Sequence, residues 1–337
     1  MESLGDILKT MPEAKRLKRS KPAPVLTPMT KKLLDAAVEI RTTSPDAIER
    51  AYMARQLVQC TLPHSNPGNV ERWMRRNGSA ALVLQAGWNA EKDCSYGYPY
   101  GSLPRLLLFW IVTEAVHTKK RRLQLGASLS EFMRQLGLIP SSAGAGKRSD
   151  AKRLRDQMRR LFAARISFQQ AVDEDGKHGE RWRNMDVAPD GELWWDIKEP
   201  DQAALWESWI ELGEKFYESV IAAPVPLDMR ALRALKQSPL ALDLYAWATY
   251  RVFSVNRKKI PQFIPWDGLK SQMGCEYGDT KDFKKKANGA LRKVRSVYPA
   301  LKISPARGGF ILHPGPTAVP ALVLTNVGVQ GFRLPAG

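Results

Sequence analysis

Two stretches of the chain, 103–137 and 240–274, share the same succession of apolar and polar positions. Each begins with a long apolar run, passes through a short basic turn, and ends in a shorter helical segment closed by glycine. Serine and proline at the start of each run supply a helix cap and a residue that needs no backbone donor, and the glycine supplies a left-handed stop. The pattern therefore predicts two helix-turn-helix units, with long helices at 102–116 and 239–253, turns at 119–122 and 256–259, and short helices at 128–137 and 264–274.

Trp110 and Trp247 occupy matching positions in the two long runs. Five positions of the two stretches are identical without a gap, against about two expected from ordinary composition, so the identities alone are weak support for a repeat. The shared order of elements is the stronger argument. We expect both indole rings to lie in the core and not to serve as stacking groups.

A third, strongly basic helix follows each unit. At about 100° per residue, its cations gather on one face while its apolar residues gather on another. Segment 147–160 holds seven Lys or Arg against two Asp, and 281–295 holds seven against one. The candidate DNA-binding residues are Arg148, Lys152, Arg155 and Arg159 in the first helix, and Lys281, Lys284, Lys285, Asn288, Arg292 and Arg295 in the second.

A basic stripe is often only a solvated helix face, usually where charges alternate in sign with partners four residues away. Here the signs do not alternate, and a one-signed face repels itself unless a polyanion lies against it. We therefore favour DNA binding. Asn288 lies among cations, and asparagine pairs with adenine as arginine pairs with guanine, so the second helix is expected to read bases. Arg155 and its neighbours are expected to hold phosphates.

A hairpin is predicted after each third helix. In the second unit, short strands at 301–304 and 310–313 flank a turn with Arg307 at its tip, a further candidate DNA-binding residue. In the first unit, strands are expected at 166–172 and 192–197, and the long mixed-charge connection in 173–201 is either mobile or a partner surface. The predicted fold class is α+β, mainly helical, with two tandem winged-helix domains.

The expected domain order follows from composition. A flexible basic arm (1–30) precedes a first winged-helix domain with N-terminal helices (31–221), and a proline-containing linker (222–228) leads to a second such domain (229–316) and a tail (317–337). A chain of 337 residues with 44% hydrophobic residues can form such cores. The arm either contacts phosphates or aids solubility, and both roles stay open.

Net charge and chemistry narrow the function. A formal charge of +18 indicates a polyanionic partner. The longest apolar run, 106–112, is far shorter than the ~20 residues that span a bilayer, and no signal peptide is evident, so we expect no membrane partner and a cytoplasmic protein. The three cysteines and four histidines are scattered, which predicts no metal, no cofactor and no enzymatic activity.

Specific motifs of the chain resemble the RepA-type plasmid replication initiators. The similarity covers roughly residues 60–315, and its specific part lies in the first unit. The motifs that carry it are Leu62–His64, Tyr96–Gly101, Pro104–Leu107, Trp110–Ile111, Thr113–Ala115, Leu125–Gly126, Ser128–Leu129, Phe132, Leu136–Gly137, Gln157–Met158 and Arg160–Phe162.

The resemblance implies an initiator that binds direct repeats (iterons) at a plasmid origin, promotes opening of the adjacent duplex, recruits the host helicase and host initiator, and represses its own gene. It also implies that the helix at 281–295 lies in the major groove while the helix at 148–159 holds the backbone. Related initiators act as monomers at the repeats and as dimers in repression, and whether this chain forms a homodimer stays open.

Other functional classes fit the sequence less well. A rolling-circle initiator needs two metal-binding histidines around one apolar residue, and no such pair is present. A transcriptional repressor or partition protein would share the fold and the basic helices, and only the family motifs argue against it. RNA binding is the weaker alternative, because no strand rich in aromatic residues is apparent.

Overall fold

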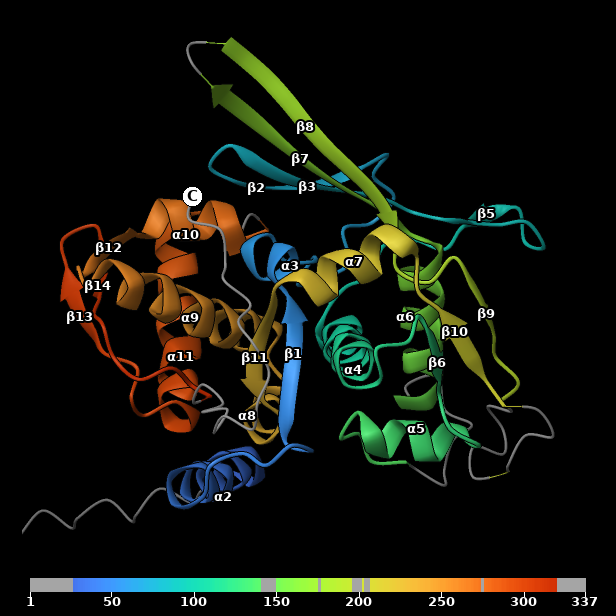
Figure 1. The fold of residues 1–337 in the computed structure, drawn as a ribbon, viewed down its shortest axis with the longest axis horizontal. Helices are drawn as coiled ribbons and strands as arrows, with labels where there is room; N and C mark the ends of the chain where they lie inside the picture. Colours follow the sequence, from blue (N-terminus) through green and yellow to red (C-terminus); the bar gives the residue numbers. More distant parts are fainter. Residues whose placement is uncertain are drawn as a thin grey trace, which may run out of the picture.

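The described part of the chain folds into a mainly helical α+β arrangement (Figure 1). The computed structural model describes residues 27–140, 150–174, 177–195, 202, 207–273 and 276–319. Most of the expected arm, most of the tail after 316, and Arg148 lie outside these residues. Within them, no helix has the length and apolar character needed to cross a bilayer.

The two stretches with matching sequence patterns adopt the same topology. In each, the strand between the first two helices pairs with the last strand, and that last strand also pairs with the one before it. The first unit comprises α4 (Ser102–Thr118), β6 (Arg122–Gln124), α5 (Leu129–Gln135), α6 (Asp150–Ala163), β9 (Asp190–Glu192) and β10 (Trp209–Glu211), with sheet order β6-β10-β9. The second comprises α9 (Pro239–Lys258), β12 (Gln262–Pro265), α10 (Trp266–Met273), α11 (Thr280–Val297), β13 (Ile303–Ala306) and β14 (Gly309–Leu312), with order β12-β14-β13.

Local sequence explains most of the helix boundaries. The Ser128 and Ser238 side chains cap α5 and α9 by accepting the backbone N–H three residues on. Gly137 follows the end of α5 with a φ of +70°, a left-handed conformation that favours glycine. The expected cap at Ser102 is wrong, since this residue lies inside α4 and Gly101 precedes it.

The second long helix is longer than predicted. Helix α9 continues through the expected turn at 256–259 as far as Lys258, and Lys259 then adopts a left-handed conformation with a φ of +55°. Lys119 does the same after α4, with a φ of +57°. Both long helices therefore end on a left-handed lysine.

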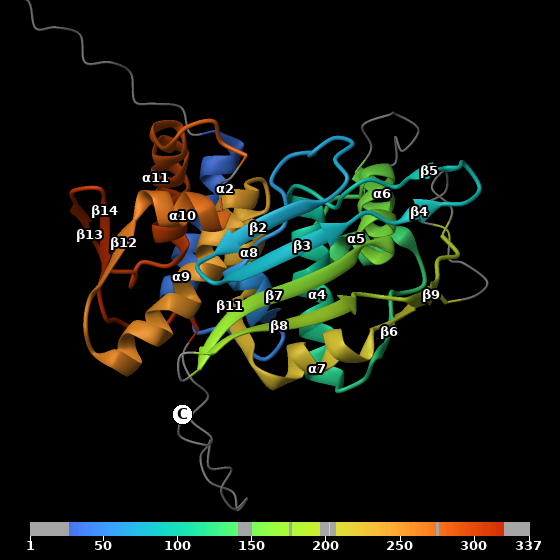
Figure 2. The same ribbon diagram turned by 90° about the horizontal axis from the view of Figure 1, so that it is seen from above.

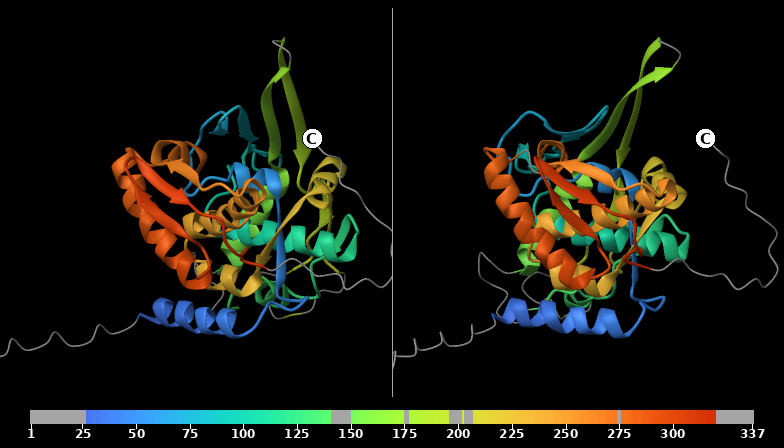
Figure 3. Two further views of the ribbon diagram at one scale, coloured as in Figure 1. Left: turned by 60° about the vertical axis from the view of Figure 1, so that its left-hand side comes forward. Right: turned by 90° about the vertical axis from the view of Figure 1, so that its left-hand side faces the viewer.

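The expected first hairpin is wrong. Strand β7 (Arg165–Glu174) pairs not with 192–197 but with β8 (Lys177–Asp186), which lies inside the segment expected to be a long connection. With β2 (Trp73–Asn77) and β3 (Ala80–Gln85) these strands form a sheet in the order β2-β3-β7-β8. Residues 177–184 are all exposed, so β8 lacks the apolar alternation that identifies a strand in sequence. Figure 3 shows this hairpin rising from the rest of the molecule.

A two-stranded sheet lies between the two units. Strand β11 (Pro224–Asp228), in the segment expected to be a linker, pairs antiparallel with β1 (Arg50–Ala54). Helix α2 (Pro28–Thr42), expected in the first domain, packs against α8 (Met229–Leu235) and α11. The remaining elements are α3 (Arg55–Gln59), β4 (Trp88–Asn89), β5 (Cys94–Ser95) and α7 (Glu214–Ala222). One continuous cluster of buried apolar side chains includes residues of both units and of β1, β11, α3 and α7.

Trp110 and Trp247 are core residues, as expected, with 6% and 2% of their surface exposed. The Trp247 ring meets the Phe310 ring edge-on, with centroids 6.2 Å apart. Trp247→Ala should lower the free energy of unfolding by about 3–5 kcal/mol, because it removes a large apolar side chain and leaves a cavity. Urea unfolding measures this loss. Trp88→Ala, at a position 62% exposed, is the control and should change stability by less than about 0.5 kcal/mol; equal midpoints for Trp247→Ala and the native chain would contradict the prediction.

Candidate nucleic-acid interface

Helix α11 buries one face and exposes a basic one. Phe283, Ala287 and Val294 are buried, and the helix packs against α9, α2 and α8. Asp279 caps its start, where the carboxylate accepts the backbone N–H of Asp282 at 2.6 Å. The six residues of α11 that are predicted to bind DNA are all exposed: Lys281, Lys284, Lys285, Asn288, Arg292 and Arg295.

Helix α6 repeats this division with one difference. Ala151, Leu154, Met158 and Leu161 are buried. Lys152 and Arg159 are exposed, but Arg155 is half-buried and its Nη1 donates to the Trp195 carbonyl at 3.4 Å. Part of the Arg155 guanidinium is therefore engaged within the first unit, and Arg159 is the better exposed probe of this face.

The two basic helices lie along one edge of the molecule. Figure 2 shows α11 toward the left and α6 toward the right, both on the edge drawn at the top. The hairpin β13–β14 lies next to α11, and Arg307 is exposed at its turn beside Gly308, whose φ is +76°. The predicted residues that the structure describes thus fall into two groups, one on α11 and its hairpin and one on α6.

Sequence reasoning missed two cations on the flank of α11. Lys286 and Lys293 line a groove with Lys285 and Arg292, and the groove is closed by Leu33 of α2 and by the start of α9. Their positions fall just outside the stripe deduced from helical periodicity. The basic surface of α11 is therefore broader than one stripe.

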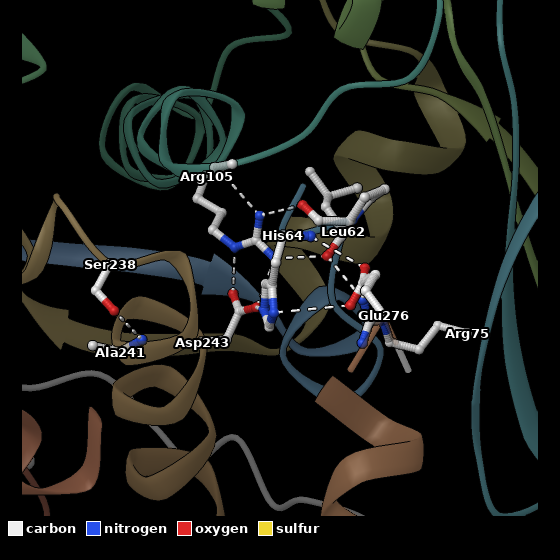
Figure 4. A network of polar contacts seen from close by, with 10 residues as sticks. Leu62, His64, Arg75, Arg105, Ser238, Ala241, Asp243 and Glu276 are labelled. Carbon is white, nitrogen blue, oxygen red and sulfur yellow. Dashed lines mark hydrogen bonds and ion pairs between the residues drawn. The ribbon is translucent and has the colours of Figure 1, made fainter. Parts of the chain in front are cut away.

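A buried ion pair connects the two long helices. The Arg105 guanidinium of α4 meets the Asp243 carboxylate of α9 through two bonds, Nε to Oδ1 and Nη2 to Oδ2, both 2.7 Å (Figure 4). Arg105 also donates to the carbonyls of Leu62 at 2.6 Å, Pro63 at 2.9 Å and Gly101 at 2.7 Å. Every donor nitrogen of Arg105 is thus engaged, which is what a buried charge requires.

His64 extends this pair toward α11. Its Nε2 lies 2.8 Å from Asp243 Oδ2, and its backbone N–H donates to Glu276 Oε1 at 3.2 Å. Glu276, just before α11, also accepts from Arg75 Nη2 at 2.7 Å. The Arg75 guanidinium, which has no exposed surface, stacks over the Trp73 ring at 4.8 Å. Figure 4 shows these five charged or titratable residues as one network.

Burial and neighbouring charges fix the protonation of the network. Burial alone would raise the pKa of Asp243, but the Arg105 guanidinium outweighs it and holds the pKa well below its usual value. Burial lowers the pKa of His64, more than the hydrogen bond to Asp243 raises it. His64 is therefore neutral near pH 7 and donates its Nε2 proton to the Asp243 carboxylate.

The sequence carried a signal for this network that the periodicity analysis did not use. Each of the two long apolar runs contains two charged residues, and Arg105 and Asp243 are the buried ones. A charge in such a place needs a partner, and charges of opposite sign in two adjacent apolar helices satisfy one another. Glu276 and Arg75 carry no comparable signal, because they lie in polar segments.

Comparison with known proteins places the first unit and the start of the second in one family. A model of the family described as plasmid encoded RepA protein matches residues 98–268, just over half of the chain. A search of curated proteins found no match. Among solved structures, a crystal structure of domains 2 and 3 of RctB is similar, with a TM-score of 0.44 and 11% identity, covering 76% of this chain and 94% of that chain. The family segment includes Arg105, Asp243 and α6, and it ends before α11.

The Arg105–Asp243 pair should show strong coupling in a double-mutant cycle. Arg105→Met leaves the Asp243 carboxylate buried without its partner, and Asp243→Leu leaves the guanidinium unpaired, so each should cost about 3–5 kcal/mol of unfolding free energy. The double variant should be more stable than the sum of the two losses predicts, by about 1–3 kcal/mol. Urea unfolding measures all three.

The exposed pair Arg153–Asp150, with a contact of 2.9 Å, is the control for this cycle. Its side chains are 60% and 43% exposed, and Arg153→Met should change stability by less than about 1 kcal/mol. Additive losses at Arg105 and Asp243 would show that the two residues act independently.

Acid should destabilise the protein through His64. A histidine whose folded pKa lies below its unfolded value near 6.5 binds its proton more readily when unfolded, so stability falls as the pH drops from about 6.5 toward the folded pKa. His64→Gln keeps a donor for Asp243 but cannot titrate. The drop in Tm between pH 7.5 and 5.5 should therefore be smaller in His64→Gln than in the native chain. Equal drops in thermal scans would show that folding does not lower the pKa of His64.

Proposed function

Because this chain belongs to the family of plasmid-encoded RepA proteins, we propose that it initiates plasmid replication by binding direct repeats (iterons) in duplex DNA. In this proposal, binding promotes opening of the adjacent duplex and recruits the host helicase and host initiator. The protein also represses its own gene, and it acts by binding, without cleaving a strand. Family membership supports the initiator role, and the geometry of α6 and α11 supports the mode of binding.

The single observation that carries the proposal is the pair of strongly basic helices, α6 and α11, on a common edge (Figure 2), each with exposed cations. In each helix the opposite face is fixed in the core, so the cations cannot turn away from solvent. Two such faces on one side of a rigid body match the continuous negative charge of a duplex backbone. Neutralised phosphates release their counterions, which makes affinity fall with added salt.

The element order supports a winged-helix assignment for both units. A strand after the first helix, two further helices and a closing antiparallel pair of strands recur in each with the same sheet order, although in the first unit β7 and β8 come between the third helix and that pair. In helix-turn-helix proteins the recognition helix enters the major groove. We assign α11 to the groove, with the wing β13–β14 and Arg307 against the flanking backbone, and α6 to a second stretch of backbone.

Footprinting on the DNA that flanks the gene for this protein tests the proposal. Protected tandem repeats, spaced near one or two helical turns, would support an initiator. A single protected palindrome over the promoter would support a repressor instead, and nicking of the DNA on addition of magnesium would contradict a role by binding alone.

Substitutions on α11 and on α6 should have different effects on DNA binding, because α11 is proposed to read bases and α6 to hold the backbone. Asn288→Ala or Arg292→Ala should reduce discrimination between repeats and random DNA by about 1–3 kcal/mol, because each removes a side chain suited to bidentate base contacts. Arg159→Ala, at an exposed position of α6, should weaken binding to both DNAs equally and lower the salt dependence by roughly one phosphate. Competition binding at two salt concentrations measures both effects. The reverse pattern would exchange the roles of the two helices.

A further inference from the structure

The sheet β2-β3-β7-β8 carries an exposed tryptophan that neither basic helix accounts for. Trp182 on β8 is 67% exposed, although β8 is fixed along its length by pairing with β7. A lone exposed aromatic ring is common on protein surfaces, so the case for a binding surface rests on the residues that surround Trp182. Figure 2 looks down on this sheet, which lies on a different side of the molecule from the edge formed by α6 and α11.

Strand register defines what surrounds Trp182. Because side chains alternate across a strand, Trp182 projects on the face opposite to the buried Met185. Directly across the sheet, the register aligns Trp182 with Gln169 of β7, Ala81 of β3 and Arg76 of β2. This row crosses all four strands on the outer face.

The row forms a groove, which we call the Trp182 groove. It has a volume of about 330 Å³, and Arg76, Ala81, Gln169, Glu180, Arg181 and Trp182 line it. The small side chain of Ala81 forms the bottom of the groove, between the longer side chains of Arg76 and Gln169 in the same row. Within the described chain, neither Arg76 nor Arg181 lies within ion-pair distance of a carboxylate, so both guanidinium groups are available to an anion.

We propose that the Trp182 groove binds single-stranded DNA, with an unpaired base stacked on the indole and phosphates held by Arg76 and Arg181. An exposed aromatic ring flanked by arginines is how proteins hold single strands without reading their sequence, since every base has a face that can stack. A duplex offers no free base face inside its stack, so the indole distinguishes unpaired from paired DNA. The polar Gln169 and Gln170 side chains contribute hydrogen-bonding groups beside the bases.

More cations continue the surface along β8. The side chains of Arg181 and Arg183 leave β8 on the face opposite to Trp182. Arg181 lies at the free edge of the sheet and lines both the Trp182 groove and an adjoining groove, which Arg183, Arg55, Gln59 and Phe168 also line. Arg55 and Arg183 are exposed. A single strand that leaves the Trp182 groove therefore meets further positive charge around the free edge of β8.

This inference deepens the duplex-opening part of the proposed function and rests on it for its biological role. Opening a duplex exposes strands that re-anneal unless something holds them apart. Figure 2 shows α6 and α11 on one edge and the strands β2, β3, β7 and β8, whose residues line the Trp182 groove, on another side. One molecule then has separate surfaces for duplex and for single strand. The expected result is selective retention of one strand beside the bound repeats.

Binding of a fluorescent oligo-dT and of a repeat-containing duplex, measured in parallel on the full chain, tests this proposal. Trp182→Ala should weaken binding of oligo-dT roughly tenfold or more, whereas Trp182→Phe should retain most of the affinity because phenyl also stacks. Duplex affinity and Tm should be unchanged in both variants. Trp88→Ala is the matched control, since Trp88 is 62% exposed but lies off the groove, and it should bind oligo-dT as the native chain does.

Charge variants provide the second arm. Arg76→Ala and Arg181→Ala should weaken oligo-dT binding, and Glu180→Gln should strengthen it at low salt by removing the one carboxylate that lines the groove. The double variant Lys284→Ala/Arg292→Ala should weaken binding of the duplex and leave binding of oligo-dT unchanged. Unchanged oligo-dT affinity in Trp182→Ala, or loss of oligo-dT binding only in the α11 variant, would overturn the Trp182 groove. If the native chain binds oligo-dT but does not bind the repeats, only the proposed function is overturned.

Discussion

The buried pair between Arg105 and Asp243 is the interaction on which the relation between the two units depends. It joins α4 and α9, the central helices of the two units, through two bonds of 2.7 Å, and Arg105 also holds the chain at Leu62 and Pro63. A buried pair contributes less to net stability than apolar packing can, because both charges lose their hydration. Its directional bonds instead select one orientation, and that orientation sets α6 and α11 on a common edge.

The rest of the network carries this constraint toward α11, one of the two helices proposed to bind DNA. His64 bridges Asp243 and Glu276, and Glu276 lies at the approach to α11. Strand β11 pairs with β1 in the same region, and α2 packs on α8 and α11. These contacts hold the two units in the same arrangement as the polar network does. A molecule held in this way presents both basic faces without reorganisation, which spares the entropic cost of ordering them at the moment of binding.

Much of this arrangement could be predicted from sequence because it follows local rules. Helical periodicity identified the buried and exposed faces of α6 and α11, and Ser128, Ser238 and Gly137 acted as the caps and the stop that their chemistry favours. The first hairpin could not be predicted. In that hairpin, strand β8 is exposed on both faces near the tip and is held there by backbone pairing with β7. Its sequence therefore lacks the alternation of apolar and polar residues that would have identified a strand around Trp182. Pairings between distant residues, such as His64 with Glu276, likewise leave no periodic signal.

The claim that one chain sets both third helices on one duplex is tested most directly by hydroxyl-radical footprinting on a single isolated repeat. The account predicts two protected backbone segments on one side of the helix. A Lys152→Ala/Arg159→Ala variant should lose protection of only one segment. Arg105→Met should make the distance between the two protected segments variable. A single protected segment, unaltered by the α6 variant, would contradict the account, because it would mean that α11 binds alone and that the buried pair does not position a second DNA-binding face.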